Sequence, residues 1–226
     1  MRTNSRKSCE ERRKLILTRV RELFAHKGLE GATTRELAQA AGISEGLLFK
    51  HFPNKEALYH AILTTCVDNI SEKVQKILSL DPSTSTLVLI VHFMVFEFIF
   101  VRLTERDDLF RLYLRSLTGD GEFARFILKE PYRNLVPKLQ ENIKAAIASG
   151  DILDSPVPLR LRACFTERLV FAIMTDFLPS IPVLNYGISR KNLIKQIVWF
   201  LLRGIGLKEE AIRCHYNAQA LRLLAG

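Results

Sequence analysis

Side chains that can hydrogen-bond to nucleic acid gather between residues 33 and 55. Arg35, Lys50 and Lys55 are cations that can bind phosphate oxygens, and an arginine can also bind a guanine edge. Residues 1–60 hold 12 Lys and Arg against 7 Asp and Glu, and the whole chain has a net charge of +9. Residues 1–14 form a basic arm that can follow phosphates, or else remain a solvated terminus. We therefore expect an anionic partner, and nucleic acid fits this pattern.

The sequence shows no arrangement typical of catalysis or of a metal site. His92, Glu97, Asp176 and His215 lack the spacing of a nucleophile, a base and an orienting group, and no HExxH or phosphate-binding loop is present. The cysteines lie far apart, without CxxC spacing, at positions 9, 66, 164 and 214. We expect no enzymatic activity, no metal and no other cofactor, and the cysteine spacing favours a reducing, cytoplasmic compartment.

Two short helices joined by a glycine corner would position the polar side chains of residues 33–52. Ala38 is small enough for a close helix crossing, and Gly42 tolerates the left-handed backbone of a tight corner. Leu48 would close the small core from the second helix. Capping residues stand at both helix starts, namely Thr33 with Glu36, and Ser44. This pattern predicts a helix-turn-helix, with an αα-hairpin of no DNA-binding role as the alternative.

The remaining segments also have helical patterns, so the predicted fold class is all-α. The N-terminus lacks an apolar signal segment, and the apolar run 87–100 is too short to cross a bilayer, so we expect no membrane partner. Pro131 is expected to separate two helices. The predicted helices span 11–27, 33–41, 44–52, 54–80, 84–103, 107–117, 120–129, 132–149, 159–177, 190–205 and 208–224.

Motifs over residues 10–60 resemble those of the TetR family of bacterial transcriptional regulators. They are Leu23-Phe24-x-x-x-Gly28, Thr33-Thr34-Arg35-Glu36-Leu37-Ala38, Ala41-Gly42-Ile43-Ser44-x-Gly46 and Leu48-Phe49-x-His51-Phe52-x-Asn54-Lys55-Glu56-Ala57-Leu58. The resemblance implies a three-helix DNA-binding domain, residues 1–55, and a C-terminal helical bundle, residues 56–226, that dimerises and encloses a small-molecule pocket. It also implies a homodimeric repressor that binds a palindromic operator and is released by an effector.

The resemblance places the second helix of the motif in the DNA major groove, where base edges can be read. In family members Lys often stands at position 45 and Thr at position 47, whereas this chain has Glu45 and Leu47. Glu45 could accept from a cytosine amino group or repel a phosphate, and Leu47 could contact a thymine methyl. The implied DNA-binding residues are Thr33, Thr34, Arg35, Ser44, Glu45, Gly46, Leu47, Phe49, Lys50, His51 and Lys55.

Two segments of the C-terminal half, residues 169–174 and 197–202, are apolar on every side. Such a helix must be covered on all faces, which happens when one face meets the core and the other meets a partner subunit. The alternative is a central helix of a monomer. The resemblance favours the dimer, with an interface formed by Phe165, Leu169, Ile173, Ile197, Phe200 and Leu201.

Large apolar side chains are dense between residues 84 and 126, which makes a cavity for a small apolar effector plausible. Plain core packing is the alternative for each of them. Glu97 needs a partner or a cationic ligand in this setting, and Arg102 and Arg168 are candidate partners. The candidate ligand-binding residues are Phe93, Met94, Glu97, Phe110, Tyr113, Phe126 and Phe165.

The function that this pattern predicts is a ligand-responsive, dimeric, DNA-binding repressor. The alternative within the same class is a DNA-binding regulator without a small-molecule effector, which answers to a protein partner or acts in nucleoid or division control. A helix bundle on a membrane surface is a further alternative, but the helix-turn-helix already accounts for the basic N-terminus.

Overall fold

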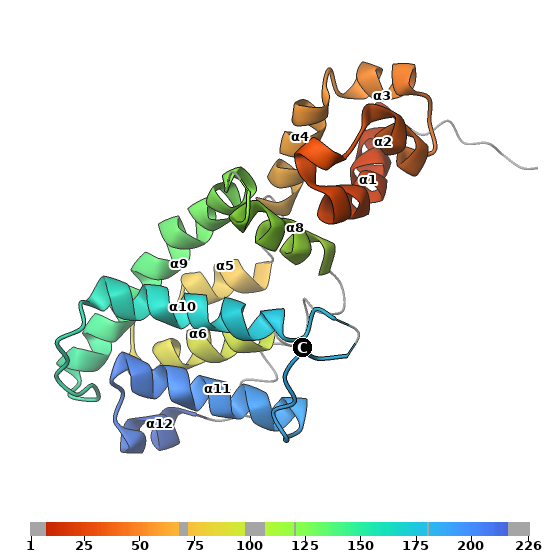
Figure 1. Cartoon of the computed structure of the whole chain (residues 1–226). Helices are drawn as coiled ribbons and strands as arrows, with labels where there is room; N and C mark the ends of the chain where they lie inside the picture. Colours follow the sequence, from red (N-terminus) through yellow and green to blue (C-terminus); the bar gives the residue numbers. More distant parts are fainter. Residues whose placement is uncertain (1–7, 68–71, 98–106, 120, 180, 217–226) are drawn as a thin grey trace, which may run out of the picture. The chain divides into compact units, whose positions relative to one another are not determined.

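The computed structural model describes residues 8–67, 72–97, 107–119, 121–179 and 181–216 (Figure 1). The described residues are mostly helical, and they form no strand apart from an isolated bridge between Ile152 and Leu207. The predicted all-α class is therefore confirmed. The chain divides into two compact units. Unit 1 takes in Met1–Asn69 and Asp108–Leu128, and unit 2 takes in Ile70–Asp107 and Lys129–Gly226.

Unit 1 is organised around the first helix of the chain. Phe24 of this helix meets Tyr59 edge to face, with ring centroids 5.3 Å apart, and Tyr59 contacts Phe123 at 5.9 Å. These contacts explain why the unit continues past residue 55 and why it includes residues 108–128. Its helices are α1 (Cys9–Gly31), α2 (Thr34–Ala41), α3 (Glu45–His51), α4 (Lys55–Val67), α8 (Asp107–Leu117) and the start of α9 (Glu122–Ala148).

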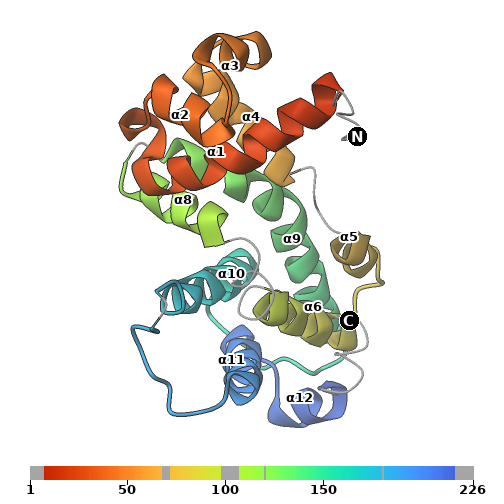
Figure 2. The same ribbon diagram turned by 90° about the vertical axis from the view of Figure 1, so that its right-hand side faces the viewer.

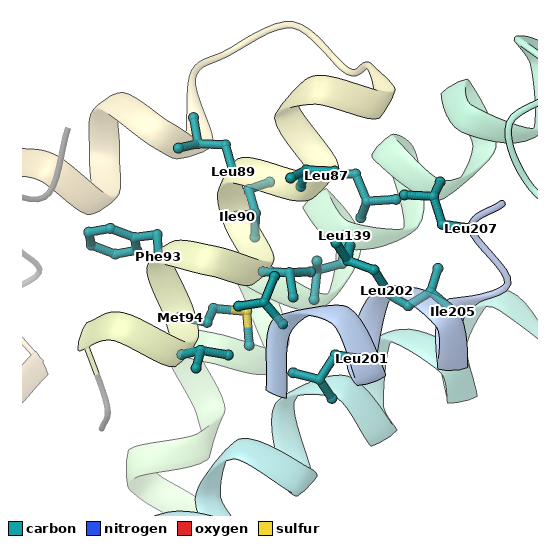
Figure 3. Close-up of a cluster of buried hydrophobic side chains, with 14 of the residues drawn as sticks. Leu87, Leu89, Ile90, Phe93, Met94, Leu139, Leu201, Leu202, Ile205 and Leu207 are labelled. Carbon is teal, nitrogen blue, oxygen red and sulfur yellow. The ribbon is translucent and has the colours of Figure 1, made fainter. Parts of the chain in front are cut away.

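Unit 2 has the larger apolar core, in which α6 packs against α11. Figure 3 shows Ile90 and Met94 of α6 meeting side chains of α11 such as Leu202, with Leu139 of α9 beside them. Ser83 caps the start of α6, and Thr84 donates to the Asp151 carboxylate at 2.5 Å. The helices of unit 2 are α5 (Glu72–Leu78), α6 (Thr84–Phe96), the rest of α9, α10 (Leu159–Thr175), α11 (Arg190–Ile205) and α12 (Glu209–His215).

The prediction of two helices separated at Pro131 is wrong. The structure has one helix, α9, that runs through Pro131 and also through Pro137. A proline removes one backbone donor and crowds the preceding turn, so it weakens a helix without always ending it. Here both halves are anchored by buried side chains, Phe123 and Ala124 in unit 1 and Val136, Leu139 and Ile143 in unit 2. Tertiary packing therefore outweighs the local signal.

Gly28 interrupts the first helix, as predicted. Its φ of 71° and ψ of −179° are not helical, so the regular helix is broken there before α1 continues to Gly31. The predicted residues 98–103 and 217–224, the candidate partner Arg102 and the basic residues Arg2, Arg6 and Lys7 lie outside the described residues. Among the described helices none is long and apolar enough to cross a bilayer.

Candidate nucleic-acid interface

The corner between α2 and α3 is built as the sequence predicts. Thr33 and Glu36 form a reciprocal capping box at the start of α2, and the Ser44 hydroxyl accepts from the Leu47 backbone N–H. Gly42 has φ 69° and ψ 36°, the left-handed conformation that ends α2 and turns the chain. The N–H of Ile43 then donates to the carbonyl of Ala38 at 3.0 Å. Both predicted caps and the predicted corner are confirmed.

A small apolar core holds the two helices together and leaves one side of α3 free. Leu37, Ala38 and Ala41 of α2 are buried together with Leu48 of α3 and Phe52 just after it. Residues 45, 46, 49 and 50 of α3 are exposed, and 46 and 50 lie on the side of the helix opposite the buried residue 48. Phe49 is 42% exposed, which is unusual for an aromatic side chain in a small helix. The exposed side of α3 is therefore available for a partner.

Two arginines of α1 cap the C-terminal ends of α2 and α3. The Arg13 guanidinium donates to the carbonyl of His51, the last residue of α3, at 2.7 Å and lies 4.2 Å from the centre of the Phe52 ring. Arg19 donates to the carbonyl of Ala41, the last residue of α2, at 2.8 Å. The ends of helices carry unpaired carbonyls and a partial negative charge, which a guanidinium neutralises. The sequence analysis missed this role, since it grouped Arg13 with the basic arm.

Glu45 has a partner inside the protein. Its carboxylate accepts from the Thr34 hydroxyl at 2.9 Å, which connects the first turn of α3 to the first turn of α2. A carboxylate at a helix start is also favoured by the helix dipole. From the sequence, only contacts with DNA were expected for Glu45 and Thr34, so this pairing within the protein was not predicted. The bond holds the Glu45 charge at the edge of α3 nearest to α2.

A surface ion pair fixes the start of α2 to α1. Lys27 Nζ lies 2.5 Å from Glu36 Oε1, while Glu36 also accepts from the backbone N–H of Thr33. The hydrogen bond from Lys27 is the main cause, with those from Thr33, of a lowered pKa of Glu36, about 2 against an ordinary 4.5. Glu36 therefore stays ionised throughout the physiological range, and the capping box keeps its acceptor.

The predicted DNA-binding residues fall into two groups, those that are exposed and those that are half-buried. Arg35, Glu45, Gly46, Phe49 and Lys50 are exposed on α2 and α3. Thr33 and Ser44 are exposed as well, but their hydroxyls accept backbone hydrogen bonds as caps. Thr34, Leu47, His51 and Lys55 are half-buried, with Lys55 at the first turn of α4 behind the cap provided by Asn54.

The predicted ligand-binding residues are divided between the two units. Phe93 and Met94 are buried in the core of unit 2, where Glu97 is half-buried and Phe165 is 59% exposed. Phe110, Tyr113 and Phe126 belong to unit 1, where Phe110 and Tyr113 stack with ring centroids 5.7 Å apart. Arg168, the candidate partner of Glu97, pairs instead with Glu167, its Nε lying 2.6 Å from that carboxylate. Phe98 and Phe100, which share the aromatic run, lie outside the described residues.

An apolar face on α10 and α11 contains most of the predicted dimer residues. Along α10, Leu161, Phe165, Leu169 and Ile173 recur every four residues and remain exposed or half-buried; we call these four residues the α10 stripe. Beside it on α11, Phe200 is 68% exposed. A groove of about 480 Å³ lies between the two helices, lined by Leu169, Ile173, Gln196, Ile197, Trp199, Phe200 and Arg203.

Two predicted dimer residues lie elsewhere. Ile197 is 5% exposed and reaches only the floor of the groove, and Leu201 is 4% exposed and packs in the core of its own chain. The uniform apolarity of residues 197–202 concealed which side faces outward. Leu161, four residues before Phe165, belongs to the same exposed stripe but was not among the predicted dimer residues.

Solved structures of other proteins share this fold. AibR, solved in complex with isovaleryl coenzyme A and operator DNA, has a TM-score of 0.64 at 22% identity, over 84% of this chain and 97% of that one. A putative fatty acid metabolism regulator from Clostridium perfringens has a TM-score of 0.65 at 20% identity. The match covers 86% of this chain and 100% of that one. At these identities the likeness shows a shared fold.

The sequence relatives align with only part of the chain. The nucleoid occlusion factor SlmA of Mannheimia succiniciproducens is 29% identical over 94 residues, 41% of this chain and 44% of SlmA. The transcriptional repressor KstR2 of Rhodococcus jostii is 39% identical over 68 residues, 30% of this chain and 33% of KstR2. The chain thus matches less than half the length of these relatives.

The family match covers the helices described above. Residues 16–62 match the bacterial regulatory proteins of the tetR family, a range that runs from the middle of α1 to the middle of α4. It includes both caps, the Gly42 corner and the exposed side of α3. By these residues, the chain matches the tetR family of bacterial regulatory proteins over α2, α3 and the adjoining parts of α1 and α4.

Proposed function

We propose that the protein is a DNA-binding transcriptional regulator, a homodimeric repressor that acts on a palindromic operator in the cytoplasm and catalyses no reaction. The observation that carries this proposal is α3, a capped helix whose outer side is exposed while its inner side is fixed by α1 and α2. Helices held in this way enter the major groove, and a dimer places two of them on half-sites one helical turn apart. The matching relatives include a transcriptional repressor, KstR2, and a nucleoid occlusion factor, SlmA.

Within this function the exposed residues of α3 take separate roles. Nothing lies within 4 Å of the position where a side chain of Gly46 would begin, so the backbone of α3 can approach a DNA groove closely there. Leu47 and Phe49 offer apolar contacts to thymine methyls, and Lys50 offers a cation. Lys55, at the start of α4, is placed to bind a phosphate together with nearby backbone N–H groups.

We expect Lys55→Ala and Leu47→Ala to have different effects on DNA binding. Loss of a phosphate contact weakens binding to every sequence alike and lowers the salt slope by about 1. Loss of a base contact costs about 1–3 kcal/mol on the preferred operator and little on random DNA. Fluorescence anisotropy with operator and random duplexes, over a range of salt concentrations, measures both effects. Equal losses on the two duplexes for Leu47→Ala would contradict its assignment to base reading.

Arg13→Met is expected to weaken operator binding about tenfold, roughly the loss of one charge-assisted hydrogen bond, while the salt slope stays nearly unchanged. The reason is that Arg13 holds the end of α3 and does not neutralise a phosphate. Lys76→Met is the matched control, because it removes the same charge from an exposed side chain on α5, outside the helix-turn-helix and the basic arm. A fall of about 1 in the salt slope for Arg13→Met would instead make Arg13 a phosphate ligand.

A small apolar effector remains part of the proposal. Its support is the shared fold with AibR, whose structure contains isovaleryl coenzyme A together with operator DNA. The second candidate, regulation without an effector, is favoured by the match to SlmA, a nucleoid occlusion factor. Acyl-coenzyme A thioesters are a suitable first panel of ligands. Release of operator DNA by one of them supports the first candidate, and unchanged binding with the whole panel favours the second.

The decisive experiment is footprinting on DNA upstream of the protein's own gene, across a series of salt concentrations. A specific dimer is expected to protect an inverted repeat, with an affinity that falls steeply as salt rises. Protection of no repeat at any salt concentration would contradict the whole proposal.

A further inference from the structure

The connection between α10 and α11 exposes several large apolar side chains. This α10–α11 loop spans residues 176–189, of which Ser180 is not described (Figure 2). Ile181 is 81% exposed and Val183 is 73% exposed, and Leu184 and Ile188 are about half exposed. Residues 177–188 carry no charged side chain. Exposed apolar side chains that cluster in this way mark an interaction surface. Single exposed apolar residues scattered over a protein are common and need no such explanation.

The base of the loop is fastened to the end of α10. The backbone N–H of Val183 donates to the Asp176 carbonyl at 2.9 Å, and the Tyr186 hydroxyl donates to the Asp176 carboxylate at 2.6 Å. The Tyr186 ring stacks on Phe177, with centroids 6.0 Å apart, and the Arg190 guanidinium lies 5.6 Å from the centre of the Phe177 ring.

These bonds persist across the physiological pH range. Burial, with the adjoining Asp176 carboxylate, raises the pKa of Tyr186 to about 12, so its hydroxyl stays protonated and keeps donating. The base of the loop is therefore fixed to the end of α10, while its apolar side chains at 181 and 183 are exposed. An ordered loop loses less conformational entropy on binding than a mobile one, which favours its use as a contact surface.

The loop directly follows α10, whose exposed side carries the apolar α10 stripe. The α10 stripe begins at Leu161, preceded by the exposed Leu153 and Val157, and it ends at Ile173, just before the loop. Exposed apolar side chains thus stand beyond both ends of one helix. A two-fold rotation that reverses the direction of α10 brings the loop of one chain to the start of the stripe in the other. Such a surface is self-complementary, as a two-fold dimer requires.

We propose that the α10–α11 loop of each subunit packs on the partner subunit, against the segment that leads into α10 and the first turn of that helix. The occupant is a second copy of this chain, because the loop is continuous with the face proposed for dimerisation and is itself uncharged. This inference rests on the homodimer of the proposed function and extends its interface. The receiving residues are Leu153, Val157 and Leu161 of the other copy.

The first test is the strength of the dimer. The double variant Ile181→Asp and Val183→Asp places two carboxylates in an apolar contact, so the dimer dissociation constant is expected to rise about 10- to 100-fold. Sedimentation of the full chain over a dilution series measures it. Ile147→Asp is the matched control, because Ile147 is 45% exposed on α9, outside the loop and the stripe. Its dissociation constant should equal that of the wild type.

The second test identifies the contact. A photo-cross-linking amino acid replaces Ile181, and isotopically light and heavy chains are mixed before irradiation. Cross-links that join light to heavy chains within residues 153–161 support the proposal, and cross-links confined to one chain overturn it. An unchanged dimer dissociation constant in the aspartate double variant also overturns the proposed loop contact. In that case the proposed homodimer still stands if Phe200→Glu yields monomers. A wild-type chain that is monomeric at every concentration would remove the dimer itself.

Discussion

Replacing Phe165 and Phe200 together by glutamate is expected to convert the dimer into monomers and to weaken operator binding by at least about a hundredfold. Both aromatic rings are more than half exposed on one face of α10 and α11. Aromatic side chains at the centre of an interface each contribute about 2 kcal/mol or more, and a buried carboxylate adds a desolvation penalty. Monomers would also lose the simultaneous binding of two half-sites.

The measurement combines sedimentation with operator binding by anisotropy. Ile147→Glu serves as the control because it adds a carboxylate to an exposed apolar site on α9. Thermal unfolding should show that the double variant remains folded, since neither ring belongs to the core of unit 2. A dimer that persists in the double variant would place the interface on another surface of the protein.

Gly42→Val is expected to destabilise the helix-turn-helix by about 2 kcal/mol or more and to abolish specific DNA binding. The left-handed backbone at this residue is strained for any side chain, and most of all for a β-branched one. A Cβ atom here would also lie 2.9 Å from Nη1 of Arg19, which caps the end of α2. Faster hydrogen exchange of the amides of α2 and α3 is the expected readout.

Gly46→Ala is the matched control for Gly42→Val. Gly46 lies inside α3 with open space around it, and alanine there should stabilise the helix by up to about 1 kcal/mol. The two glycines are four residues apart, so the comparison separates backbone strain from the simple addition of a side chain. Equal exchange rates in the two variants would show that the corner tolerates another conformation.

What could be predicted from the sequence was mostly local. The caps at Thr33 and Ser44 and the corner at Gly42 depend on residues within four positions of one another, and all three are present. The contacts of Arg13 with His51 and of Arg19 with Ala41 join residues 38 and 22 positions apart. No periodicity in the sequence indicates such pairs, because they depend on how α1 crosses the other helices.

Exposure was harder to predict than helix position. Residues 197–202 were correctly placed on a helix, but their uniform apolarity could not show that Phe200 faces outward while Leu201 is buried. The candidate ligand-binding residues share the same difficulty, since apolar side chains suit a packed core as well as a cavity. Pro131 predicted a helix end that does not occur, because packing at both ends of α9 outweighs the local effect of the proline.

The spacing between the two capping arginines of α1 determines whether both can reach the ends of α2 and α3. Arg13 and Arg19 are six residues apart, which places their backbones about 9 Å apart along the helix axis. Inserting or deleting one residue between them would rotate one guanidinium by about 100° away from its carbonyl. Relatives that use both caps should therefore vary freely in the exposed residues between them while keeping the same spacing.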